Sequence, residues 1–133
     1  MKKIFTILGA VAVAAMSNAQ IVISEVYGGG GGATSVYIND FIELKNLGSS
    51  AATLSNGVLQ YASASGTFNS YIALPSSITL APGQKYLVEM VPATPNPAGA
   101  SLPTADFQAT TNNSTTTGQS YNGGFNMSAA NGK

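Results

Sequence analysis

The sequence predicts an all-β fold of antiparallel strands, either a sandwich or a barrel, and three observations support this prediction. Short apolar segments follow one another at intervals of roughly 8 to 12 residues, separated by turns rich in glycine, proline, serine and asparagine. Within these segments, apolar and polar residues alternate with the two-residue period of a strand. After residue 19, no segment has the period of an amphipathic helix, so we expect no helix in the folded domain.

The expected strands follow in order along the chain. They cover residues 21–27, 36–46, 58–62, 68–74, 78–80, 85–91 and 106–108, with a weak final strand at 121–128. In the second strand, Val36, Ile38, Ile42 and Leu44 share one parity, which predicts that one face is buried. Residues 85–91 are apolar on both parities apart from Glu89, so we place this strand centrally in its sheet.

Turns and loops separate these strands. The turn signals are Ser55-Asn56-Gly57, residues 63–67 and Ala81-Pro82-Gly83-Gln84, in which proline presets one backbone angle and glycine accepts a positive one. We expect a loop of small residues at 47–52, a semi-rigid proline-rich loop at 92–103 and a polar tract at 110–118.

The first 19 residues have the pattern of a bacterial secretory signal peptide. Lys2 and Lys3 form a positive start, Ile4 to Met16 is an uncharged apolar run, and Ser17-Asn18-Ala19 places small residues at a cleavage site. The apolar run has thirteen residues, fewer than the roughly 20 that span a membrane. We therefore predict a signal peptide at 1–19, one domain at 20–133, a secreted or cell-surface location and no membrane span.

The composition excludes several classes of function. Charged residues make up 8% of the chain, against about 25% in ordinary globular proteins. The sequence has no histidine, cysteine or arginine, so the commonest general base, the usual zinc ligands and the thiol nucleophile are missing. Three lysines after residue 19 are too few for nucleic-acid binding. We predict no enzyme activity, no cofactor, and no catalytic, cofactor-binding or metal-binding residues.

Several segments together resemble the lamin tail domain of bacterial secreted proteins, an immunoglobulin-like β-sandwich. They are Ile21 to Gly31, Asn39 to Asn46, Leu59 to Ser63, Ile78 to Val88, Ser101 to Thr104 and Asn126 to Lys133. Two features depart from the family pattern. The usual tryptophan before the third strand is replaced by Asn56-Gly57-Val58, and the family continues past the final Gly-Lys into a closing strand. Because Ala130-Asn131-Gly132 is a hairpin signal with only Lys133 after it, we expect a truncated domain that lacks its closing strand.

The resemblance implies a non-catalytic module that binds or positions something outside the cell. Two alternatives remain open. In the first, the chain is the N-terminal accessory domain of a longer secreted hydrolase, nuclease-like or phosphatase-like. In the second, it is a structural surface protein that assembles through edge strands. The partner is an unknown protein or a surface glycan, for which Tyr27, Tyr37, Tyr71 and Tyr121 offer an aromatic face. The interpretation that we favour for these tyrosines is strand packing.

Two patterns invite a chemical interpretation. The run Gly28 to Gly32 formally matches a dinucleotide fingerprint, but a β-prone segment follows it where a helix is required, so we interpret the run as a flexible hairpin loop. The acids Glu25, Asp40 and Glu43 flank this loop, and two of them converge on a weak calcium site if the strands pair. We favour the alternative, in which Glu25 and Glu43 face solvent and Glu43 lies opposite a lysine.

Overall fold

The computed structural model describes residues 20–68, 70–92, 97–109 and 125–128, and this part of the chain contains eight strands and no helix. The strands are β1 (Ile21–Tyr27), β2 (Phe41–Asn46), β3 (Ala52–Ser55), β4 (Val58–Tyr61), β5 (Ser70–Ala73), β6 (Ser77–Leu80), β7 (Lys85–Glu89) and β8 (Phe107–Gln108). The predicted all-β, immunoglobulin-like fold is confirmed. In the described residues, no helix is long and apolar enough to cross a membrane.

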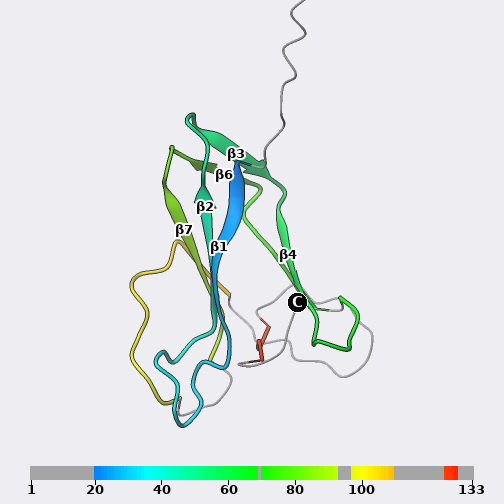
Figure 1. Ribbon diagram of the computed structural model, residues 1–133, viewed down its shortest axis with the longest axis vertical. Helices are drawn as coiled ribbons and strands as arrows, with labels where there is room; N and C mark the ends of the chain where they lie inside the picture. The colour runs from blue at the N-terminus through cyan, green and yellow to red at the C-terminus, as the bar shows by residue number, and fades with distance from the viewer. Residues whose placement is uncertain (1–19, 69, 93–96, 110–124, 129–133) are drawn as a thin grey trace, which may run out of the picture.

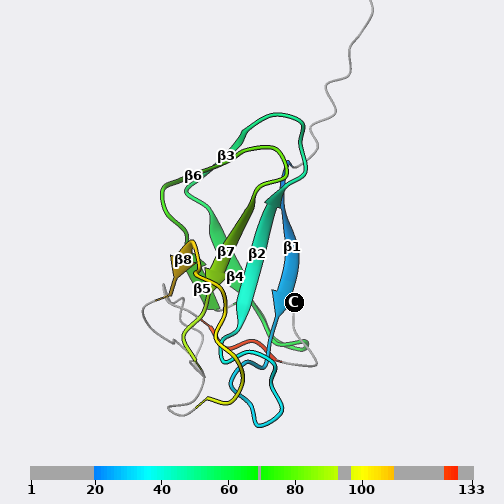
Figure 2. The same cartoon turned by 90° about the vertical axis from the view of Figure 1, so that its left-hand side faces the viewer.

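The strands form two layers, which Figures 1 and 2 show from two sides. One layer is a four-stranded sheet in the order β1-β2-β7-β8, and the other contains two antiparallel pairs, β3-β6 and β4-β5. The short strand β8 pairs with β7 in parallel, with Val88 opposite Phe107. Strand β7 therefore lies inside its sheet, between β2 and β8, as its apolar sequence predicted.

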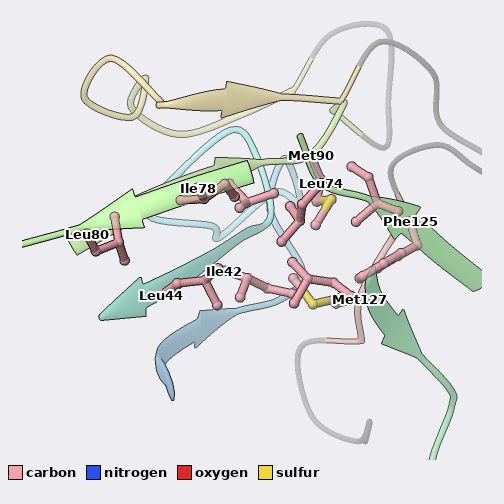
Figure 3. Packing of buried hydrophobic residues seen from close by; sticks show 11 residues of the cluster. Ile42, Leu44, Leu74, Ile78, Leu80, Met90, Phe125 and Met127 are labelled. Carbon is pink, nitrogen blue, oxygen red and sulfur yellow. The ribbon is translucent and has the colours of Figure 1, made fainter. Parts of the chain in front are cut away.

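The hydrophobic core fills the space between the layers (Figure 3). Ile42 and Leu44 of β2 and Val88 of β7 face Leu59, Ile72, Ile78 and Leu80 from the opposite layer. Burying one such side chain completely contributes roughly 1.5–3 kcal/mol. Because the domain has few charges and no disulfide, this apolar contact is its main source of stability.

The second strand begins later than the sequence predicted. Ile42 and Leu44 are buried on the core face as expected, but β2 starts at Phe41 and not at residue 36. Val36, expected on the buried parity, is 64% exposed in the loop before the strand. The reason is that Asn39 and Asp40 use their side chains to fix the loop, as described below.

Two further expectations about strands were wrong. Residues 52–55 form β3, where the sequence predicted only the end of a loop at 47–52 and the start of a turn at 55–57, because Leu54 pairs with Ile78 of β6 and packs against the core. Residues 125–128, expected in a final strand, are not in a strand, although Phe125 and Met127 are both buried. The backbone of this segment forms hydrogen bonds with loops and with side chains. Alternate side chains therefore point into the core although the segment joins no sheet.

Other predicted segments shift slightly or lie outside the described residues. The strand predicted at 68–74 is β5 at Ser70–Ala73, and Phe68 is exposed. The turn at 81–84 is confirmed, with Gly83 at a φ of 74°. The signal peptide at 1–19, the polar tract at 110–118 and the hairpin signal at 130–132 lie outside the described residues.

Candidate functional site

The glycine loop, residues 28–40, connects β1 to β2 and is held by the carboxylate of Asp40. One oxygen of this carboxylate, Oδ1, accepts a hydrogen bond from the backbone N–H of Gly30 at 2.6 Å. The other oxygen, Oδ2, accepts one from the backbone N–H of Met127. The Asp40 residue is only 3% exposed. One buried carboxylate therefore joins the loop, the start of β2 and the 125–128 segment.

Two opposing effects act on the pKa of Asp40. Burial raises the pKa above its ordinary value, because the charged form loses contact with water. Hydrogen bonds from the backbone amides of Met127, Gly30 and Gly29 lower it, but by less than burial raises it. The partners of this carboxylate are backbone amides of its own fold, which is the environment of a structural acid.

The glycines of this loop are required by close packing. A Cβ on Gly30 would lie 2.4 Å from the backbone carbon of Asn39, and one on Gly28 would lie 2.6 Å from the carbonyl oxygen of Ser128. Gly29 and Gly31 have φ values of 77° and 75°, which favour glycine. Our interpretation as a flexible hairpin loop was therefore wrong about the role of the glycines. The run is a packed loop that follows β1 and leads into no helix.

The other two flanking acids lie on the sheet. Glu25 of β1 is opposite Glu43 of β2, across a β-bulge at Ser24. Glu43 accepts a hydrogen bond from the Ser24 hydroxyl at 2.6 Å and forms an ion pair with Lys85 at 2.9 Å. These two contacts lower the pKa of the Glu43 carboxyl. The expected lysine partner of Glu43 is thus Lys85, which lies diagonally across from it on β7.

The structure does not gather these acids into a calcium site. Asp40 is buried in the glycine loop, whereas Glu43 is bound to Ser24 and Lys85 and Glu25 is exposed. Over the described ranges, no group of three or more acidic side chains is placed to hold a metal ion.

Of the tyrosines proposed as a binding face, the three that the structure describes do not share one surface. Tyr27 stacks on Phe41 with ring centroids 5.4 Å apart, and the ring of Tyr37 packs edge-on against both. The Tyr27 hydroxyl also accepts the backbone N–H of Val36 at 2.9 Å. These two tyrosines therefore hold the glycine loop, while Tyr71 lies on β5 in the other layer and Tyr121 is outside the described residues.

A small cavity that the sequence did not reveal lies beside the end of β7. It has a volume of about 180 Å³, and its lining includes Asn39, Glu89, Met90, Pro92, Gln108 and Ala109. Within the described part of the chain, the Asn39 side-chain oxygen, Oδ1, is buried and has no hydrogen-bond partner. No sequence signal marks this site, because its residues come from three separate segments.

The packing of the glycine loop can be tested by adding one methyl group. Gly30→Ala should lower the free energy of unfolding by at least about 1–3 kcal/mol, because its Cβ overlaps the Asn39 backbone. Gly32→Ala is the matched control, since its Cβ would meet only the Ser35 hydroxyl, at 3.0 Å, and the Gly29 carbonyl oxygen, at 3.5 Å. Urea unfolding measures both. Equal stability of the two variants would contradict close packing at Gly30.

The hydrogen bonds of Asp40 can be tested with an amide. Asp40→Asn offers one oxygen to two backbone donors, so the N–H of Gly30 or Met127 loses its partner. The lost hydrogen bond costs about 1–3 kcal/mol, and removal of the buried charge offsets part of this cost, so we expect a net fall in the free energy of unfolding within that range. Asp106→Asn is the control, because exposed Asp106 accepts only the Leu87 N–H among the described residues, and water can replace it. A smaller loss in Asp40→Asn than in Asp106→Asn would refute the proposed role.

The ion pair of Glu43 predicts a pH dependence. Its lowered pKa stabilises the fold at pH values above the unfolded pKa of about 4.5, and this stabilisation is lost as pH falls through the folded pKa. Glu43→Gln should therefore be less stable than the natural protein at pH 7, and the difference should disappear near pH 3. Urea unfolding at both pH values, with Glu25→Gln as the control for removed charge, tests this. A difference that persists at pH 3 would show that the ion pair is not its cause.

Comparison with known proteins assigns the chain to a family. The family model described as Lamin Tail Domain matches residues 14–130, which is most of the chain. Comparisons with curated proteins and with solved structures give no match. The family is that of an immunoglobulin-like domain, in agreement with the two β layers and the predominantly antiparallel pairing described above. The chain belongs to the lamin tail domain family.

Proposed function

We propose that this protein is an exported, non-catalytic module that binds an extended segment of a partner polypeptide along β1 and so positions it. The pattern of residues 1–19 supports export. A non-catalytic role is supported by the hydrogen bonds of the acidic side chains. Four carboxylates accept a hydrogen bond from within the domain, namely those of Asp40, Glu43, Glu89 and Asp106.

The observation that carries the proposal is the exposed apolar edge of the four-stranded sheet. Strand β1 is at the end of the strand order, and its Ile23 and Val26 are 54% and 56% exposed. Their ladder partners, Leu44 and Ile42, belong to the core, and cross-strand partners share a face. Ile23 and Val26 therefore lie on the core side of the sheet and are still half open to solvent.

The bulge in β1 explains how both residues reach that face. Residues 23 and 26 are three apart, so a regular strand would turn them to opposite faces. The register shift at Ser24 adds one residue to β1 and places both on the core side. An added strand would pair with the β1 backbone and cover this apolar pair, which is the mode of recognition known as β-augmentation.

The charge on β1 favours a partner with basic residues over a second copy of this chain. Glu25 is exposed and lies next to Glu43 in the ladder. Antiparallel pairing of β1 with its own copy about the strand centre would bring two Glu25 carboxylates opposite or diagonal to each other, which is unfavourable. A partner strand that carries a lysine near Glu25 would form an ion pair instead. The same mode of binding would suit an accessory domain of a secreted hydrolase.

Synthetic peptides test this proposal directly. An eight-residue peptide that alternates valine with lysine should bind the exported chain in a fluorescence anisotropy titration. Replacing its lysines with glutamate, or its centre with proline, should weaken binding, because charge and strand pairing are lost. Ile23→Lys should weaken binding by about tenfold or more. Val36→Lys is the control, because Val36 is equally apolar and 64% exposed but lies outside β1.

Two outcomes would overturn the proposal. If no peptide binds, or if Ile23→Lys binds as tightly as Val36→Lys, β1 is not the binding edge. If the chain dimerises in sedimentation equilibrium and Ile23→Lys abolishes the dimer, the occupant of β1 is a second copy, and the function is assembly through edge strands.

A further inference from the structure

The second layer of the sandwich, which contains β3-β6 and β4-β5, carries no charged residue. From Asn46 to Gln84, a stretch that includes all four of these strands, the sequence has no lysine, arginine, aspartate or glutamate. The charged side chains of the described residues belong to β1, β2 and β7, apart from Asp106 before β8 and the buried Asp40. The domain therefore has one charged layer and one neutral layer.

The outward side chains of the second layer are mainly hydroxyls and amides. Leu59, Ile72 and Ile78 point into the core, and successive residues of a strand point to opposite sides, so the neighbours of these residues point outward. The outward residues include the cross-strand pairs Thr53–Thr79 and Ser55–Ser77 on β3-β6 and the pair Gln60–Tyr71 on β4-β5. We call these six residues the neutral face.

Several polar groups on the neutral face are available to a ligand. The hydroxyls of Thr53 and Thr79 bond to each other at 2.9 Å and are exposed. The Gln60 amide is exposed, the Tyr71 side chain is partly exposed, and neither side chain has a hydrogen-bond partner in the described part of the chain. An amide and a phenol both donate and accept hydrogen bonds. The tyrosine ring adds an apolar surface beside them.

This composition selects the chemistry of the ligand. A charged ligand would lose hydration on the neutral face without finding a countercharge, which is costly, so an uncharged ligand is favoured. Protein interfaces bury a core of apolar and aromatic anchors, whereas the large apolar groups here are Val58 and the Tyr71 ring. A neutral polysaccharide matches better, because its hydroxyls both donate and accept and its C–H surfaces pack on an aromatic ring.

We propose that the neutral face binds a neutral polysaccharide. The ring of Tyr71 packs against a sugar ring, and the Gln60 amide and the hydroxyls of β3-β6 bond to the sugar hydroxyls. This site goes beyond the proposed function and does not depend on it, because β1 belongs to the other layer. A chain with both sites would hold a polypeptide at a glycan surface.

The experiment is a pull-down of the exported chain with three insoluble neutral polymers, microcrystalline cellulose, curdlan and mannan. The bound fraction should rise with polymer and reach saturation for at least one of them. Because no ion pair contributes, the affinity should be the same at about 50 mM and about 500 mM salt. Absence of saturable binding to all three polymers, or binding that is lost at high salt, would overturn the proposal.

Three variants locate the site. Gln60→Glu changes one exposed amide into a carboxylate and should weaken binding by about tenfold or more, because the new charge finds no partner in the complex. Gln84→Glu is the matched control in the turn before β7, where a carboxylate still accepts the Ala81 N–H, and it should leave the affinity unchanged. Ile23→Lys should also leave it unchanged, although it weakens peptide binding at β1.

Circular dichroism shows whether each variant is folded. Equal affinity of folded Gln60→Glu and Gln84→Glu would overturn the proposal, as would loss of polysaccharide binding in Ile23→Lys. Self-association that Gln60→Glu abolishes, without saturable binding to a polymer, would assign the neutral face to a second copy of the chain and would also overturn it.

Discussion

The structure depends on one buried carboxylate. The side chain of Asp40 binds the backbone of Gly30 and of Met127, which lies 87 residues further along the chain. Its own carbonyl accepts the N–H of Met90, where β7 ends. Three segments that are distant in sequence therefore meet at this residue. Phe125 and Met127 belong to no sheet in the described chain, and this junction helps to hold their backbone so that both side chains reach the core.

The fold uses its few polar core groups unequally. At the end of β2, Asn46 is fully buried, and its amide nitrogen donates to the carbonyls of Ser50 and Leu80 while its oxygen accepts the N–H of Gly48. Both N–H groups and the oxygen of that amide therefore have hydrogen-bond partners. Just before the start of β2, Asn39 is also buried, and its oxygen Oδ1 has no hydrogen-bond partner among the described residues. The contrast matters because Asn46 shows that the protein can satisfy a buried amide completely.

Much of the fold could be predicted from local pattern. The alternation of Ile42 and Leu44 identified the core face of β2, and Pro82-Gly83 identified a turn. Such signals are carried by neighbouring residues. The start of β2 could not be found in this way, because contacts of Asp40 with residues 10 and 87 positions away end the loop. Around Phe125 and Met127, the alternation of apolar and polar residues predicted which side chains are buried. It did not predict whether the backbone of this segment joins a sheet. The cavity at Asn39 is formed by segments that are separate in the sequence, so no sequence motif could predict it.

The two buried asparagines also protect the sheet against slipping. A shift of β2 by two residues would keep Ile42 and Leu44 facing inward, so apolar contacts alone would tolerate it. The same shift would move Asn46 away from Leu80 and Asn39 away from Met90, leaving several buried groups unpaired. Because the domain has so few charges, the register between its strands is fixed by the buried amides near the two ends of β2. The apolar side chains stabilise the packing but do not distinguish one register from another.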